Sequence, residues 1–86
     1  MLISEDVVEL TRALVAMDTI NPPGHEADCS SFLAQLLEDA GFYVQIQEFA
    51  KGRTNLVAKV GQPDLGLPIC FTGHMDTVPL GLTPWT

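Results

Sequence analysis

The sequence predicts an α/β fold: part of an α/β/α sandwich in which two N-terminal helices pack on a three-stranded part of a mixed sheet, antiparallel at the edge. Apolar residues recur at three- and four-residue spacing in two segments before residue 41, which indicates amphipathic helices. Apolar and polar residues then alternate, which indicates a strand with one buried face. Residues 68–73 begin with a continuous apolar run, which is typical of strands covered on both faces.

The first helix is expected to begin after Ser4 and to end near Asp18. Ser4 is the expected N-cap, and Glu5 and Asp6 place negative charge at the positive end of the helix dipole. The apolar stripe of this helix consists of Val7, Leu10, Leu14 and Met17. Its spacing predicts that one side of the helix is apolar and packs on the sheet.

A proline-rich connector, Asn21-Pro22-Pro23-Gly24, separates the two helices. Two successive prolines fix their own backbone angles and lack N–H donors, so we expect a rigid, extended connector. The second helix is expected to start around Glu26 and to end at Gly41, since glycine suits the residue after a helix. Its apolar positions are Cys29, Phe32, Leu33, Leu36, Leu37 and Ala40.

Three strands are expected to follow, over residues 42–48, 55–60 and 68–73, with a turn at residues 51–53. Too few residues separate consecutive strands for a crossover helix, so the first two strands are expected to pair antiparallel. The most apolar strand comes last, where it would lack a neighbour on one side. The sequence therefore predicts an incomplete unit, in which residues 1–86 form the N-terminal part of a larger domain.

The size and hydropathy of the chain favour the same interpretation. A domain of 86 residues buries a modest share of its surface, yet 47% of these residues are hydrophobic and the mean hydropathy is +0.22. Part of the apolar surface is therefore expected to pack against sequence outside this chain.

The charge balance argues against several classes of partner. Eleven acidic residues against four basic residues give a net charge of −7. Nucleic-acid binding requires clustered lysine and arginine, so no nucleic-acid partner is expected, and Lys51 and Arg53 are expected to be solvated at the predicted turn. No segment approaches the roughly 20 apolar residues that cross a bilayer, and the N-terminus lacks the pattern of a secretory signal. We therefore expect neither membrane association nor secretion.

The two cysteines, Cys29 and Cys70, lie far apart and form no Cys-x-x-Cys motif. Both fall at positions expected to be buried, so we expect two reduced core thiols in a cytoplasmic protein. A disulfide between them stays open as the alternative. A nucleophilic role for Cys70 is not expected, since reactive thiols require partial exposure and a positive neighbour.

The segment that points to chemistry is residues 72–79, which follow the third predicted strand. Residues two apart in an extended chain point to the same side, so His74 and Asp76 can approach one another while Met75 points into the packing. A carboxylate beside an imidazole accepts one ring N–H and leaves the other nitrogen free for a metal such as Zn²⁺. Alone, this spacing is weak evidence for a metal site, and an ordinary hydrogen-bonded pair that closes a strand is the favoured interpretation.

Two motifs together give the chain a family resemblance. Thr72-Gly73-His74-Met75-Asp76-Thr77-Val78-Pro79 resembles the first metal motif of the zinc-dependent aminoacylase/carboxypeptidase family, which includes acetylornithine deacetylase, succinyl-diaminopimelate desuccinylase and glutamate carboxypeptidases. Asp18-Thr19-Ile20-Asn21-Pro22-Pro23-Gly24 looks like the connector between the first two helices of that family. The order of predicted elements is similar too, so the resemblance covers essentially the whole chain.

The resemblance implies that His74 binds one of two zinc ions, with Co²⁺ or Mn²⁺ as alternatives, and that Asp76 is an active-site carboxylate. It further implies a bridging Asp, a general-base Glu with an adjacent metal-binding Glu, another carboxylate and a late His, none of which this chain contains. The complete enzyme would hydrolyse the amide bond of N-acyl amino acids, as a deacetylase or desuccinylase of amino-acid metabolism in the cytoplasm. A homodimer is among its expected assemblies, and the 86-residue chain alone is expected to be inactive.

Three other residues are expected to have structural roles, and two alternative functions stay open. His25 is expected to be an exposed turn residue rather than a ligand, and Phe71 and Trp85 are expected to pack rather than to contact substrate. One alternative is a small non-catalytic α/β domain that binds a partner through its apolar sheet edge. Another is a truncated product without a function of its own. A cooperative thermal transition would favour the partner-binding domain, whereas an unpaired last strand predicts poor cooperativity or aggregation.

Overall fold

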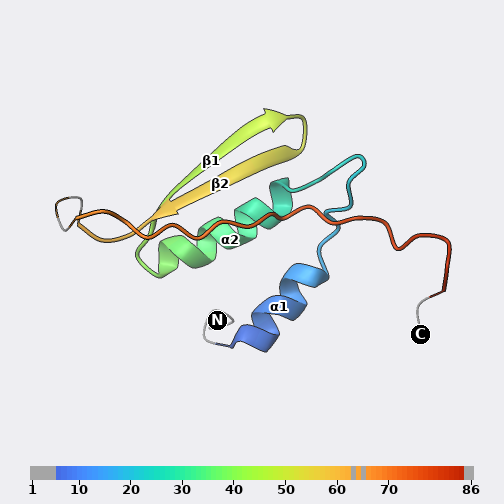
Figure 1. The fold of residues 1–86 in the computed structure, drawn as a ribbon, viewed down its shortest axis with the longest axis horizontal. Coiled ribbons are helices and arrows are strands. Elements are labelled where there is room, and N and C mark those ends of the chain that lie inside the picture. Colours follow the sequence, from blue (N-terminus) through green and yellow to red (C-terminus); the bar gives the residue numbers. More distant parts are fainter. Residues whose placement is uncertain (1–5, 63, 65, 85–86) are drawn as a thin grey trace.

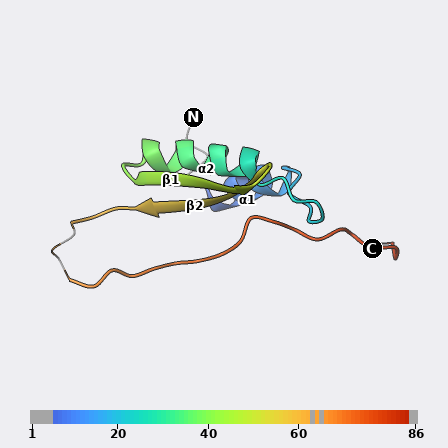
Figure 2. The same ribbon diagram turned by 90° about the horizontal axis from the view of Figure 1, so that it is seen from above.

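The computed structural model describes residues 6–62, 64 and 66–84. The elements are α1 (Val7–Val15), α2 (Ala27–Asp39), β1 (Tyr43–Ala50) and β2 (Arg53–Lys59). β1 and β2 form an antiparallel hairpin that packs on α2. Figure 2 shows the chain over residues 66–84 running back in extended form on the β2 side of the hairpin. Figure 1 shows α1 lying apart from this α2–hairpin unit.

The N-cap of α1 is Asp6, which the sequence analysis had placed inside the first turn. Its Oδ1 accepts hydrogen bonds from the backbone N–H groups of Val8 and Glu9, at 2.9 and 3.2 Å. The carboxylate thus satisfies two N–H groups that lack helical partners. The predicted cap, Ser4, lies outside the described residues.

The apolar stripe of α1 does not pack on the sheet as predicted, because α1 has no buried residue. Val7 and Val15 are each 78% exposed. In the described part of the chain, α2 packs on both strands of the hairpin, whereas α1 makes no comparable contact with either strand. The helix also ends at Val15, earlier than predicted.

The proline-rich connector forms a tight turn, so the prediction of an extended connector is wrong. The N–H of Gly24 donates to the carbonyl of Ile20 at 2.8 Å, which closes a turn around Asn21, Pro22 and Pro23, and the Asn21–Pro22 and Pro22–Pro23 bonds are cis. Gly24 has a φ of 90°, and a Cβ at this buried position would collide with the Arg53 side chain. The turn places the connector beside the start of β2.

The second helix is confirmed, with its end at the predicted glycine. Gly41 has a φ of 95°, and its N–H donates to the Glu38 carbonyl at 3.0 Å, while the N–H of Phe42 donates to the Leu37 carbonyl at 2.9 Å. This pair of bonds satisfies carbonyls at the end of α2 and turns the chain into β1. The residues that α2 buries are Cys29, Ser30 and Ala34.

The antiparallel pairing of the first two strands is also confirmed. Val44 lies opposite Ala58 and Ile46 lies opposite Leu56, with an irregularity between Glu48 and Ala50 near the turn. Ile46 is 43% exposed, so the apolar face of β1 is only partly covered by α2.

The third predicted strand is not formed, and the described residues contain two strands instead of three. Residues 68–73 are extended, and Cys70 is exposed, while Ile69 and Phe71 are 83% and 92% exposed. A strand needs a neighbour that supplies backbone partners along its length. Within the described residues, the first strand-like pairing after β2 is an isolated parallel bridge between Ile20 and Thr77, beyond residues 68–73.

Candidate functional site

The two motifs that carry the family resemblance lie side by side. In the parallel bridge, the N–H of Asn21 donates to the Thr77 carbonyl at 2.8 Å, and the N–H of Thr77 donates to the Thr19 carbonyl at 2.9 Å. Thr19 is buried, and its hydroxyl lies 3.4 Å from the hydroxyl of Thr77. These hydrogen bonds hold the turn after α1 against Thr77, the residue that follows Asp76.

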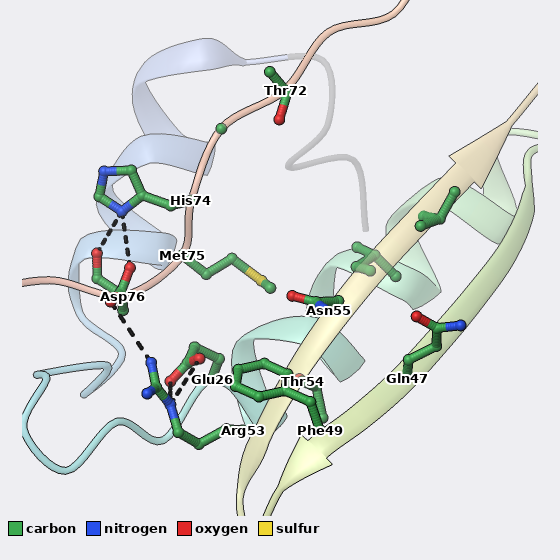
Figure 3. Close-up of a pocket in the computed structure, with 13 residues that line it drawn as sticks. Glu26, Gln47, Phe49, Arg53, Thr54, Asn55, Thr72, His74, Met75 and Asp76 are labelled. Carbon is green, nitrogen blue, oxygen red and sulfur yellow. Dashed lines mark hydrogen bonds and ion pairs between the residues drawn. The ribbon is translucent and has the colours of Figure 1, made fainter.

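His74 and Asp76 approach one another as predicted. Nδ1 of His74 lies 3.0 Å from Oδ1 of Asp76 and 2.8 Å from the Asp76 backbone oxygen (Figure 3). Both oxygens accept hydrogen bonds, so Nδ1 carries a proton, and in the neutral ring Nε2 keeps a free lone pair. His74 was expected at the C-terminal end of a buried strand. Its side chain is instead 81% exposed and lies on an open, extended segment.

The second oxygen of Asp76 is held by two other side chains. Nδ2 of Asn21 donates to Oδ2 at 3.0 Å, and Nη2 of Arg53 lies 3.6 Å from the same oxygen. The hydrogen bond from Asn21, together with the hydrogen bond and charge of His74 and the charge of Arg53, lowers the pKa of the Asp76 carboxyl, although partial desolvation opposes the shift. The carboxylate is thus favoured in its ionised form, in which both oxygens accept.

Arg53 is itself anchored by Glu26, at the N-terminus of α2. Nε of Arg53 lies 3.2 Å from each carboxylate oxygen of Glu26, whose residue is 4% exposed. The guanidinium carbon lies 5.3 Å from the centre of the Phe49 ring, which adds a cation–π contact. Arg53 therefore joins two carboxylates through one planar group, as Figure 3 shows.

This network was not expected from the sequence. Arg53 was expected to be solvated in a turn and Glu26 to favour the helix dipole, whereas the two form a largely buried ion pair 27 positions apart in the chain. No spacing rule links residues so far apart. One signal in the sequence was available. The chain has only four basic residues, so any buried acidic residue has few possible partners, and Arg53 is one of them.

Met75 points away from the His74–Asp76 pair, as predicted, and reaches the interior beside α2 (Figure 3). Its Sδ accepts a hydrogen bond of 3.6 Å from the hydroxyl of Ser30, which is fully buried and also bonded to the Thr54 hydroxyl. This contact fixes the residue between His74 and Asp76 to both α2 and β2.

A cleft of about 420 Å³ separates residues 72–76 from the hairpin. Its walls include Phe49 of β1 and residues 53–57 of β2, and the His74–Asp76 pair lies along its other side. The pair therefore borders an open cleft and is not enclosed by the fold.

The described residues supply one candidate metal ligand and no complete site. No group of three or more His, Cys, Asp or Glu side chains among them could hold a metal ion together. His25 is exposed, as expected. The Nε2 lone pair of His74 suits a metal, but a catalytic zinc site normally uses three protein ligands.

Both cysteines are free thiols, so the alternative of a disulfide is wrong. Cys29 is buried, and burial together with the nearby Glu26 charge raises the pKa of its thiol. Cys70 is exposed because residues 68–73 are not covered, which corrects the expectation that it lies in a strand interior.

Among the described residues, no helix is both long and apolar enough to span a bilayer.

Comparison with known proteins gives matches at the level of sequence. Succinyl-diaminopimelate desuccinylase of Wolbachia pipientis wMel is 39% identical over 83 residues, covering 93% of this chain and 19% of the relative. Acetylornithine deacetylase of Proteus mirabilis is 37% identical over 86 residues, covering 92% of this chain and 22% of the relative. No family model and no solved structure matches the chain. The chain is thus a homologue of these proteins that spans about one fifth of their length.

Proposed function

We propose that this chain, a homologue of succinyl-diaminopimelate desuccinylases and acetylornithine deacetylases, is the N-terminal part of the catalytic domain of a metal-dependent hydrolase that cleaves the amide bond of N-acyl amino acids. The names of the relatives support this substrate class, since each describes removal of an acyl group from an amino acid. The observation that carries the proposal is the hydrogen bond between His74 and Asp76, which leaves one imidazole nitrogen free beside an open cleft.

His74 is proposed to bind one of two zinc ions through Nε2, with Co²⁺ or Mn²⁺ as substitutes. Asp76 holds the proton on Nδ1 and orients the ring, which increases the basicity of the nitrogen that faces the metal. Bound metal would polarise the scissile carbonyl and lower the pKa of the attacking water. The remaining ligands and the general base would come from sequence outside this chain, so the chain alone is proposed to be inactive.

Two further properties are proposed for the complete enzyme. Its partner is a small N-acyl amino acid, with neither nucleic acid nor membrane as a partner, which agrees with the net charge of −7. We also propose a cytoplasmic location, where the free thiols of Cys29 and Cys70 would stay reduced, and a homodimeric assembly.

A chimaera tests the catalytic role. Residues 1–86 replace the matched segment of the Proteus mirabilis acetylornithine deacetylase, and hydrolysis of acetylornithine is measured after removal and restoration of zinc. We expect zinc-dependent turnover that His74→Ala abolishes. The matched control is His25→Ala, which removes the other histidine of this chain at an exposed position and is expected to preserve turnover.

Gel filtration and circular dichroism establish that both variants are folded before rates are compared. Equal zinc-dependent turnover in the His74→Ala and His25→Ala chimaeras would reject the role of His74. A folded chimaera that hydrolyses acetylornithine equally well with and without metal would reject the proposed reaction class.

A further inference from the structure

The Asp76 carboxylate is held from both ends, by side chains that come from three separate parts of the chain. Oδ1 accepts from His74, whereas Oδ2 faces Nδ2 of Asn21 at 3.0 Å and Nη2 of Arg53 at 3.6 Å. Asn21 lies in the turn after α1, and Arg53 is the first residue of β2. The two oxygens of the carboxylate therefore have different and complementary partners.

We propose that Asn21 and Arg53 are positioning residues that hold Asp76 so that its free oxygen faces Nδ1 of His74. The proposal rests on the proposed function, since the oriented imidazole matters for metal binding. The Asp76 side chain turns about two bonds, so its carboxylate can present either oxygen or neither to the ring. The hydrogen bond from Asn21 and the ion pair with Arg53, both at Oδ2, restrict this rotation and leave Oδ1 to His74.

Asn21 can act in this way because its own position is fixed. Its backbone N–H is bonded to the Thr77 carbonyl at 2.8 Å, one residue beyond Asp76. A Thr77 N–H bond to Thr19 closes the other side of the same bridge, at 2.9 Å. The backbone bonds between the two motifs therefore hold the Asn21 side-chain amide beside Oδ2 of Asp76.

Arg53 is fixed by a different contact, which makes its contribution independent. Its Nε pairs with both oxygens of the buried Glu26, each at 3.2 Å, so the guanidinium plane cannot turn away without leaving a buried charge unpaired. Nη2 remains directed toward Asp76. A lysine at this position would keep the charge but could not serve both carboxylates with one planar fork.

The test uses the tautomer of His74 in the 86-residue chain, measured by long-range ¹H–¹⁵N NMR of histidine-labelled protein at neutral pH without metal. His25→Gln assigns the two rings, and the exposed His25 supplies the reference for a free imidazole. We expect His74 to carry its proton on Nδ1, and His25 to favour no such fixed tautomer. A His74 ring whose tautomer matches that of His25 in the unaltered chain would overturn the proposal.

Variants then separate positioning from general structural damage. Asn21→Ala is expected to shift the His74 tautomer toward that of His25 with the amide spectrum of α2 and the hairpin retained. Arg53→Met is expected to cause the same shift, read under conditions in which its folded amide spectrum persists despite its lower stability. Arg53→Lys is expected to restore part of the Nδ1–H fraction. The matched controls are Gln35→Ala, which removes an exposed amide–carboxylate bond to Asp39, and Arg12→Met, which removes an exposed ion pair with Glu9.

An unchanged tautomer in both Asn21→Ala and Arg53→Met would overturn the proposal. So would an equal shift in the two control variants, or a shift that appears only together with collapse of the amide spectrum. The measurement involves neither metal nor turnover, so its failure is distinguishable from failure of the proposed hydrolase activity.

Discussion

Replacing Arg53 by methionine is expected to destabilise the packing of α2 on the hairpin. The substitution keeps a long apolar stem but removes the partner of Glu26, whose side chain is 5% exposed. Loss of one partner from a buried ion pair costs about 3–5 kcal/mol, because the remaining charge is buried without compensation. The Arg53 side chain is 25% exposed, so water can reach part of the vacated space and we expect the lower end of this range, about 3 kcal/mol.

Amide hydrogen exchange of the 86-residue chain measures this loss residue by residue and does not require a cooperative transition. The reporters are protected amides such as that of Ser30, which bonds to the Glu26 carbonyl at 2.8 Å. A loss of about 3 kcal/mol corresponds to exchange faster by about 150-fold, up to the limit set by the stability of the unit. The control Arg12→Met removes an ion pair with 74% and 56% exposed side chains, and we expect less than about 1 kcal/mol.

The double variant Glu26→Gln/Arg53→Met sharpens the test. Without the buried charge, loss of the arginine should cost much less, so the two substitutions should be strongly non-additive. Equal exchange rates in Arg53→Met and Arg12→Met, or additive effects in the double variant, would refute the claim that Arg53 compensates a buried carboxylate.

Three more outcomes are expected. An alkylating reagent should modify the exposed Cys70 well before the buried Cys29, as mass spectrometry of the tryptic peptides would show, and equal rates would contradict the burial of Cys29. The fold raises the pKa of the Cys29 thiol, so this thiol loses its proton at a lower pH in the unfolded chain than in the folded chain. The free energy of unfolding should therefore fall as pH rises above the ordinary thiol pKa, and this fall should be absent in Cys29→Ala. Ser30→Ala removes the hydroxyl shared by Thr54 and Met75 and should cost about 1–3 kcal/mol by hydrogen exchange, whereas an unchanged rate would show that this buried contact is dispensable.

Substitutions in the uncovered segment distinguish the proposed function from the partner-binding alternative. Ile69 and Phe71 are 83% and 92% exposed, so Ile69→Lys with Phe71→Lys should leave hydrogen exchange of α2 and the hairpin unchanged and should raise the solubility of the chain. A cooperative, soluble chain that loses its thermal transition in this variant would instead favour an independently folded domain.

Local signals predicted the elements whose structure depends on nearby residues. Helical periodicity and Gly41 sufficed for α2, and alternation followed by a short turn sufficed for the antiparallel hairpin. The spacing of His74 and Asp76 predicted that the two side chains meet, because this requires only an extended backbone.

The features that the sequence analysis missed depend on distant contacts. The apolar run before His74 predicted a buried strand. Apolar residues favour burial, but burial also requires a neighbouring element, and none covers this run in the described residues. The connector, similarly, was expected to be extended from its prolines alone, although its Gly24–Ile20 bond and the pairing of Asn21 with Thr77 decide its shape. Arg53 was misjudged for the same reason, since nothing local identifies Glu26 as its partner.

The most direct test of the account is the environment of the His74 ring when metal is bound. In the chimaera loaded with Co²⁺, an imidazole bound through Nε2 keeps an exchangeable Nδ1 proton, which NMR detects as a strongly shifted resonance. We predict that one of the strongly shifted resonances disappears in His74→Ala and persists in His25→Ala, while those of histidine ligands outside residues 1–86 persist in both. A spectrum that is the same in all three proteins would show that His74 binds no metal and would contradict the central claim.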